Sequence, residues 1–290
     1  MAIFKIDKQK VTKYKVKDDG FGDEFALRDF FASNLETLLG IRFIEKEYPI
    51  LEGRIDTLGL DENNSPVIIE YKWKENEEVL AQGLFYYNWL IKNKKHFELL
   101  VENRLGKSIK VNWDQPRVLL VAQGFGRYIQ GAVEQEKNIE LLSYHFYDPD
   151  ILHLESIYTP QTIRLSRKAV TKEDAGEYNL DYHLDITSSE MQKKFKLLRE
   201  QILQLPEVEE KENQKSGITY KTTKSFVRFE FRPTWIMVLL RDPDYKEDTK
   251  KLVKDVTSND WGYKGMVKLQ PETEIDYIFA LIKVSYESTL

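Results

Sequence analysis

The chain has 290 residues, 41% of them hydrophobic, and a formal net charge of −5, so it can bury a full core and is long enough for two domains. It contains no cysteine, which excludes disulfides, thiolate zinc sites, iron–sulfur clusters and cysteine nucleophiles. The negative charge argues against a protein that coats nucleic acid through its overall field, although it leaves a local basic groove open.

Two stretches of the chain are rich in basic residues. The first has one opposing acid, Asp7, among its lysines, which are Lys5, Lys8, Lys10, Lys13, Lys15 and Lys17. The second contains Lys92, Lys94, Lys95, Arg104, Lys107 and Lys110. Either stretch could hold phosphates, but lysines solvated on an exposed face explain each stretch equally well.

The apolar runs of the sequence are short. Residues 235–240 and 277–282 fall far below the roughly 20 residues needed to cross a bilayer. Residues 1–17 lack the continuous apolar stretch and small-residue cleavage site of a secretory signal. We therefore expect a cytoplasmic protein with no transmembrane helix and no membrane partner.

Residues 1–160 predict one α/β domain. A helix is expected at 23–39, where apolar residues recur at helical spacing and Gly40 follows them. Three antiparallel strands are expected next, at 42–50, 54–60 and 66–73, because turn-forming residues separate them. The remaining elements are a helix at 77–103, a buried strand at 117–123, a helix at 128–135 and strands at 139–147 and 151–158. Together they predict a mixed sheet flanked by helices, with a right-handed crossover.

The second half of the chain predicts a small α+β domain at 185–290. Polar clusters with weak periodicity place the interdomain connection at 161–184. Thr187 and Glu190 form a capping-box pattern at the start of the first helix. The remaining elements are expected as strands at 218–221, 225–232, 235–241 and 265–269 and a helix at 274–286.

Charged residues lie near the start of the strand expected at 54–60 and near the end of the strand expected at 66–73. Side chains two apart in a strand share a face, so Glu70 and Lys72 point the same way and Tyr71 points to the other face. If the preceding strand pairs through the turn at 61–65, Asp56 reaches the same end of the sheet. Three charged groups would then converge there.

Such a group is suited to a hard divalent cation. Mg²⁺ prefers oxygen ligands and is usually held by one or two carboxylates plus substrate phosphate oxygens. We expect Asp56 and Glu70 to be those carboxylates, with the backbone carbonyl of Tyr71 as a third ligand of Mg²⁺ or Mn²⁺. Lys72 would orient or activate the attacking water and stabilise charge that builds on a phosphate.

The aspartate followed by Glu-X-Lys on the next strand resembles the PD-(D/E)XK nuclease superfamily, whose fold is the restriction-endonuclease-like mixed sheet. The pair Gln82-X-X-X-Tyr86 looks like the additional motif of the RecB-type branch, where these residues support the active site or the DNA. The resemblance implies a metal-dependent DNA endonuclease that acts in DNA repair or defence.

Within this superfamily, residues 23–147 are most similar to the nuclease domain of the NucS/EndoMS endonucleases. The similarity lies in Glu47-Tyr48, the Gly-Arg-Ile-Asp turn that ends at Asp56, the Glu-X-Lys strand and the strand at 118–122. It implies a catalytic role for Glu24, which falls where that family places an acidic residue. Those enzymes carry an N-terminal dimerisation and DNA-binding domain, whereas a short lysine-rich segment precedes the motif here, so mismatch recognition does not carry over.

Each of these residues also has a structural explanation. Glu24 would interact favourably with the helix dipole, and Gln82 and Tyr86 would pack the helix against the sheet. Arg54 would touch a phosphate or pair with a carboxylate. The histidines lack ligand spacing, which argues against a zinc site.

A second function, from a different class, is also compatible with these residues. A superfamily fold can host different chemistry or none, so the alternative is a catalytically silent scaffold that binds DNA or a protein. Many nucleases of this type pair two active sites, which makes a homodimer one expectation, although the sequence shows no heptad or other self-association pattern.

Overall fold

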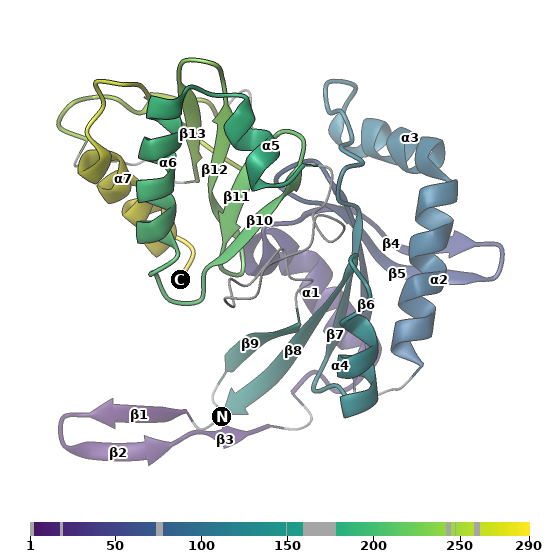
Figure 1. Cartoon of the computed structure of the whole chain (residues 1–290). Helices are drawn as coiled ribbons and strands as arrows, with labels where there is room; N and C mark the ends of the chain where they lie inside the picture. Colours follow the sequence, from purple (N-terminus) through teal and green to yellow (C-terminus); the bar gives the residue numbers. More distant parts are fainter. Residues whose placement is uncertain are drawn as a thin grey trace.

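Two sheets organise the protein in the computed structural model, one built from residues 15–158 and the other from residues 209–269 (Figure 1). The structure describes residues 3–17, 20–73, 78–148, 150–158, 178–241, 245–246, 248–257 and 262–290. Within these ranges, every helix is too short or too polar to span a lipid bilayer.

The first sheet is mixed and has seven strands, in the order β3-β8-β7-β6-β5-β4, with β9 paired to β8. Its strands are β3 (Lys15–Val16), β4 (Arg42–Ile50), β5 (Gly53–Leu60), β6 (Pro66–Tyr71), β7 (Arg117–Ala122), β8 (Ile139–Asp148) and β9 (Ile151–Tyr158). Strands β4, β5 and β6 pair antiparallel, whereas β6, β7 and β8 are parallel. The antiparallel meander and the mixed sheet predicted for this half are confirmed.

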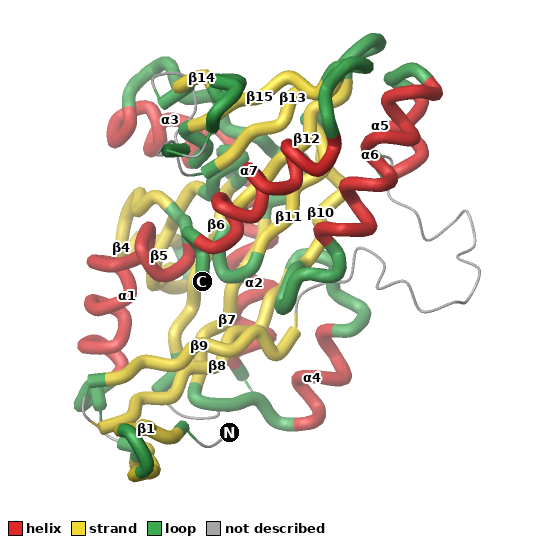
Figure 2. The backbone as a smooth tube through the Cα atoms, turned by 90° about the vertical axis from the view of Figure 1, so that its left-hand side faces the viewer, coloured by secondary structure: helices red, strands yellow, loops and turns green. Residues whose placement is uncertain are grey.

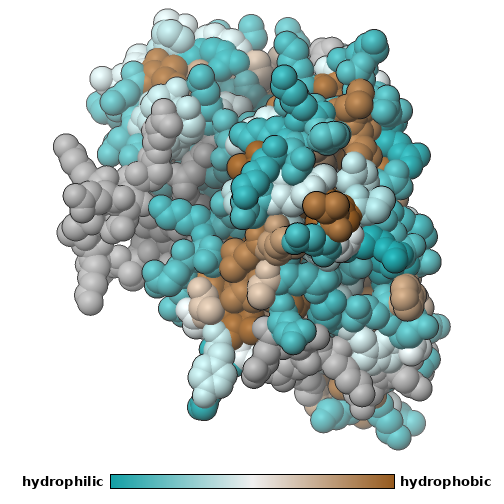
Figure 3. All heavy atoms as spheres, turned by 90° about the vertical axis from the view of Figure 1, so that its right-hand side faces the viewer, coloured by the Kyte–Doolittle hydropathy of each residue, from teal (hydrophilic) through white to brown (hydrophobic). Residues whose placement is uncertain are grey.

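Helices cover both faces of this sheet. One core cluster joins α1 (Glu24–Leu39) to the side chains of β6 and β7 that face it, and a second cluster joins α2 (Val79–Lys92), α3 (Lys94–Leu105) and α4 (Arg127–Val133) to the opposite face. Viewed from the right-hand side of Figure 1, the surface is mainly hydrophilic, with one larger hydrophobic patch near its centre and smaller patches elsewhere (Figure 3).

The single helix predicted at 77–103 is wrong, because α2 and α3 are separate helices. Asn93 lies between them with φ −115° and ψ 33°, outside helical values. Its side chain donates to the carbonyl of Trp89 at 2.8 Å, in competition with the helical backbone pattern. A polar residue that bonds to its own preceding turn therefore breaks an otherwise continuous helical sequence.

The second sheet has the order β10-β11-β12-β13-β15-β14. Its strands are β10 (Glu209–Gln214), β11 (Gly217–Lys221), β12 (Ser225–Phe231), β13 (Ile236–Leu240), β14 (Lys254–Asp255) and β15 (Gly265–Leu269). The helices α6 (Ser189–Ile202) and α7 (Ile275–Glu287) contribute to one core cluster with its strands (Figure 1). The mixed sheet and this α+β part together give the predicted fold class.

Two details of this half differ from prediction. The N-cap of α6 is Ser188, whose side chain accepts from the Met191 amide, and not Thr187. Residues 161–177 of the predicted connection at 161–184 lie outside the described residues. Helix α5 (Leu180–Asp185) occupies the last part of the connection. The domain boundaries stay a prediction.

The two sheets meet at the turn that joins β5 to β6. Glu62 in this turn forms an ion pair with Arg241 and accepts from the Ser225 amide at 3.2 Å. Asn63 accepts from Arg228 at 2.8 Å. The turn that connects the two candidate site strands is therefore held at its other end by β12 and by the residue after β13.

A two-stranded hairpin precedes the first sheet and was not predicted. It consists of β1 (Phe4–Asp7) and β2 (Lys10–Lys13), paired antiparallel. Both tube and ribbon views show it projecting from the lower end of the structure (Figures 1 and 2). All residues of both strands are exposed, so backbone pairing and not burial forms this element.

Candidate active site

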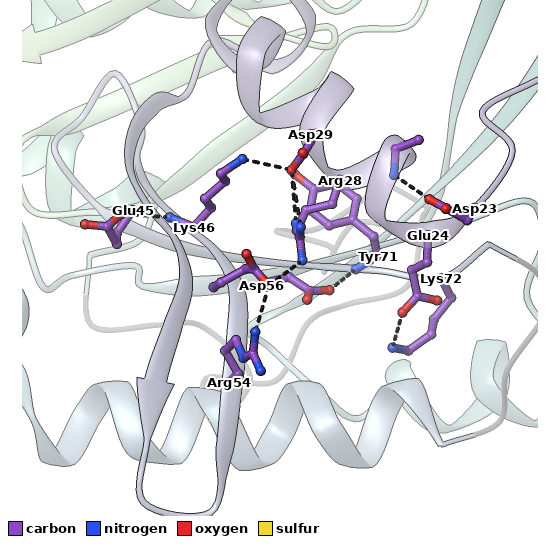
Figure 4. A network of polar contacts seen from close by, with 12 residues as sticks. Asp23, Glu24, Arg28, Asp29, Glu45, Lys46, Arg54, Asp56, Tyr71 and Lys72 are labelled. Carbon is purple, nitrogen blue, oxygen red and sulfur yellow. Dashed lines mark hydrogen bonds and ion pairs between the residues drawn. The ribbon is translucent and has the colours of Figure 1, made fainter.

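Three elements bring four charged residues together at one end of the first sheet; Figure 4 labels three of them, Asp56, Lys72 and Glu24. Thr57 pairs with Ile69 in the register of β5 and β6, so Asp56 and Glu70 come next to each other in the two strands. Lys72 follows β6 directly, and Glu24 is the first residue of α1. The convergence predicted from the strand spacing is therefore present in the structure.

Backbone hydrogen bonds hold these elements in place. The amide of Tyr71 donates to Asp56 Oδ2 at 3.1 Å, and the amide of Lys72 donates to the carbonyl of Val121 at 2.8 Å. The Tyr71 ring packs against Phe31 on the α1 face, with 5.5 Å between ring centroids. The strand end is thus fixed by both neighbouring strands and by α1 on one face, and Tyr71 points away from Glu70 as predicted.

Glu70 is the most buried charged group of the site, with 1% of its side chain exposed. Burial raises its pKa to about 8, and the charge of Asp56 adds to the increase. Burial also raises the pKa of Asp56. Two adjacent carboxylates that both resist ionisation indicate a place where a bound cation would be stabilising.

Lys72 is the cation that the structure places beside these carboxylates. Its ammonium lies 3.3 Å from Glu70 Oε1 and 3.3 Å from Glu24 Oε1. Burial opposes its charge, but Glu70, Glu24 and Asp56 together outweigh this effect and raise the pKa of Lys72. Lys72 is therefore protonated at neutral pH and acts as a hydrogen-bond donor.

The donor set fits a divalent cation. Glu70 Oε2 is buried and has no hydrogen-bond partner among the described residues, although its other oxygen contacts Lys72. A buried carboxylate oxygen without a donor is costly unless a ligand satisfies it. No group of three or more acidic, histidine or cysteine side chains suited to a metal occurs in the described part of the chain. Asp56 and Glu70 supply two carboxylates, and Mg²⁺ is usually held by one or two. The ligand role of the Tyr71 carbonyl stays a prediction.

Glu24 connects to the site through Lys72 and the backbone. Its Oε1 contacts the Lys72 ammonium, and its Oε2 accepts from the Trp73 amide at 3.3 Å. Asp23 caps the same helix by accepting from the Ala26 amide at 2.7 Å. The start of α1 is thereby fixed against the end of β6.

Gln82 and Tyr86 lie side by side on α2, and the Gln82 amide donates to the Tyr86 hydroxyl at 3.1 Å. Tyr86 is only 4% exposed and belongs to the core cluster on that face. A Cβ at Gly53 would lie 3.2 Å from the Tyr86 hydroxyl, so the ring packs beneath the β4–β5 hairpin. None of the contacts recorded among the described residues joins this pair to Asp56, Glu70 or Lys72, and its supporting role stays a prediction.

Arg54 pairs with Glu47 at 2.8 Å and keeps 62% of its side chain exposed. Glu47 also forms an ion pair with Arg28 at 3.2 Å, and Arg28 is almost completely buried. The positive charge of Arg28 lowers the pKa of Asp56, against the larger effect of burial.

Arg28 was not among the site residues predicted from the sequence. It lies four positions after Glu24 on α1, so both occupy one helix face. That spacing was the available signal. Glu47 adopts φ 52°, in the left-handed region, so its position beside the site depends on the tertiary structure.

Comparisons with known proteins give relatives but no family. No family model matches the chain. An uncharacterized protein of Haemophilus influenzae is 28% identical over 98% of both chains. Among solved structures, a repair endonuclease from Pyrococcus abyssi matches with 20% identity and a TM-score of 0.27, over 39% of this chain and 43% of that one.

An EndoMS structure in complex with double-stranded DNA matches with 15% identity and a TM-score of 0.27, over 48% of this chain and 62% of that one. The matched regions thus cover less than two thirds of the solved chains. At TM-scores this low, neither similarity bears on function.

Proposed function

We propose that this protein hydrolyses phosphodiester bonds in DNA as an endonuclease that requires Mg²⁺ or Mn²⁺. The observation that supports the proposal is the buried pair of Asp56 and Glu70, with one unpartnered oxygen, beside the Lys72 ammonium. A structural ion pair would explain Lys72 but not two carboxylates with raised pKa values at one strand end.

Asp56 and Glu70 would hold the cation, which when bound supplies a polarised phosphate and a water of lowered pKa. The Tyr71 amide keeps Asp56 aimed at this position. Lys72, as a protonated donor, would stabilise negative charge on the phosphate and orient the attacking water. Glu24 positions Lys72 by its contact at 3.3 Å.

The proposal is tested by cleavage of duplex, single-stranded, flapped and mismatched DNA, and of RNA, with Mg²⁺ and Mn²⁺. We expect Glu70→Gln and Lys72→Ala each to lower the rate by a factor of roughly 100 or more, the usual effect of removing a group that stabilises the transition state. Glu212→Gln is the matched control, because Glu212 is also a buried glutamate with a raised pKa but belongs to the second sheet. It should cleave at the wild-type rate.

Equal rates in the wild type, Glu70→Gln and Lys72→Ala would reject the assigned site. If the folded protein cleaves no substrate with either metal, yet binds DNA with an affinity that Glu70→Gln and added Mg²⁺ leave unchanged, the silent scaffold is the correct function. Circular dichroism and thermal unfolding of each variant separate loss of activity from loss of fold.

A further inference from the structure

The N-terminal segment 4–17, which we call the N-terminal arm, contains the hairpin of β1 and β2 and the short strand β3. A two-stranded hairpin without a supporting core is marginally stable in water, and both strands of this hairpin are fully exposed. Its side chains are therefore available to a partner along the whole length of the hairpin.

The arm concentrates positive charge on a molecule whose net charge is −5. It contains six lysines and one acidic residue, Asp7. All six lysines are exposed, and none of the ion pairs found among the described residues involves them. Lysines such as Lys46, Lys211 and Lys221, by contrast, are paired with carboxylates.

The arm is anchored at the end of the sheet that carries the candidate active site. Val16 of β3 pairs with Tyr147 of β8, and β9 occupies one edge of β8 at this position. A strand has two edges, so β3 pairs with the edge of β8 opposite to β9. This is the same edge with which β7 pairs in the first part of β8. Strand β3 therefore lies in line with β7, beyond the level at which β6 and β7 end.

The distance from the arm to the site suits a DNA duplex. Tyr71 pairs with Val121 of β7, and Val121 pairs with Leu142 of β8. The arm attaches to β8 at Tyr147, five residues further along that strand. Five residues correspond to about 16 Å of strand, or roughly five base pairs at 3.4 Å each. Lys17 is also only seven positions before Glu24, which limits their separation to about 25 Å.

A hollow of about 360 Å³ lies at the base of the arm. Its lining combines two lysines with two tyrosines and a valine, namely Lys13, Tyr14, Lys15, Val16 and Tyr147. Ammonium groups next to aromatic rings are typical of surfaces that follow a nucleic acid backbone.

From the exposure, charge, position and hollow together, we propose that the N-terminal arm binds the phosphate backbone of DNA beside the candidate active site. The inference rests on the proposed function, because it names the surface that holds the same DNA. It is tested in a different way, by binding in the absence of metal, so that either conclusion can fail alone.

The test measures the affinity of the full chain for a fluorescein-labelled 30-base-pair duplex by anisotropy, in EDTA, between 50 and 200 mM salt. We expect Lys13→Gln/Lys15→Gln to weaken binding roughly fivefold or more at 100 mM salt and to reduce the slope of log affinity against log salt by about 2, one for each lost phosphate contact. The control is Lys193→Gln/Lys196→Gln, which removes two exposed lysines from α6 and should leave affinity and slope unchanged.

Wild-type affinity and slope in Lys13→Gln/Lys15→Gln would overturn the proposal, as would a wild-type protein that binds no DNA.

The competing partner is a second copy of this chain, because Phe4, Ile6 and Val11 share one exposed face of the hairpin. If Phe4→Ser/Ile6→Ser converts a dimer to a monomer in sedimentation while Lys13→Gln/Lys15→Gln binds DNA normally, the arm is a self-association element. Metal-free binding that depends on the arm, without cleavage under any condition, would keep this inference and reject the endonuclease.

Discussion

Two buried glutamates in the first sheet illustrate how the same side chain serves structure or chemistry. Glu140 is surrounded by Arg117, Lys211 and Lys221, and these charges hold its pKa well below its usual range although burial opposes them. Glu70 has one cation beside it and an acidic neighbour, and its pKa rises to about 8. The first carboxylate is satisfied within the protein, whereas the second is incompletely satisfied until something binds.

This difference predicts opposite effects of neutral substitutions on stability. The folded-state pKa of Glu70 is raised above its ordinary value of 4.5, so this residue lowers the free energy of unfolding as pH rises from about 4.5 to about 8. Glu70→Gln should therefore stabilise the metal-free protein at pH 9, on the order of 1 to 3 kcal/mol, with little effect at pH 4.

Urea unfolding in EDTA at the two pH values measures the effect. Glu140→Gln is the control with the opposite sign, because its folded-state pKa is lowered and its contribution is present at pH 9. A Glu70→Gln protein that is less stable than the wild type at pH 9 would contradict the prediction.

At the scale of elements, α1 links a local capping interaction to the site. Asp23 accepts from the Ala26 amide, and the next residue, Glu24, contacts Lys72. The geometry of the first helical turn therefore determines where a site carboxylate lies.

Asp23→Ala should lower the free energy of unfolding by about 1 kcal/mol, as expected for loss of an N-cap, and should also reduce DNA cleavage because Glu24 is no longer held. Ser188→Ala removes the equivalent cap from α6. It should cost a similar free energy and leave cleavage unchanged. Urea unfolding and cleavage rates, measured on both variants, test the link, and equal activity in the two variants would show that the cap has no role in the site.

Most elements of the first sheet were predictable because their own residues specify them. The apolar spacing of α1 and the turn residues around β5 and β6 are local signals. The alternation of side chains along β5 and β6, together with the turn between them, also placed Asp56, Glu70 and Lys72 at one end of the sheet. The break at Asn93 was missed because a single polar residue changes the backbone without interrupting the apolar pattern.

The elements that were not predicted depend on partners distant in sequence. Strand β10 contains only polar residues, yet it pairs with β11 and its Lys211 contacts Glu140 of the other sheet at 2.8 Å. The hairpin of β1 and β2 buries nothing. Glu47 likewise combines a positive φ with an ion pair to Arg28, a residue of α1 distant from it in sequence.

At the scale of the whole molecule, a buried ion pair joins the two sheets. Glu62 is 5% exposed, and Arg241 contacts it while donating to the Ser225 carbonyl at 2.5 Å. A Cβ at Gly262 would lie 2.4 Å from Glu62 Cβ, so a glycine provides the space for this side chain. The two halves are thus fitted to each other at a charged and closely packed point.

Arg241→Met should lower the free energy of unfolding by about 3 to 5 kcal/mol at pH 8, because it leaves a buried carboxylate without its cation. Burial already raises the pKa of Glu62, so the uncompensated charge costs more as pH rises above about 4.5, and the loss should be smaller at pH 5. Thermal and urea unfolding at both pH values provide the measurement. Adding Glu62→Gln to Arg241→Met should restore much of the stability, and failure to do so would show that the charge is not the cause.

The turn between β5 and β6 has a consequence for any attempt to reduce the protein to its first sheet alone. The strands that carry Asp56 and Glu70 are joined by the loop that Arg228 and Arg241 of the second half hold in place. Excising that half would leave an acidic loop exposed and would free the hairpin whose opposite end carries Asp56 and Glu70. A shortened chain would therefore need a redesigned loop.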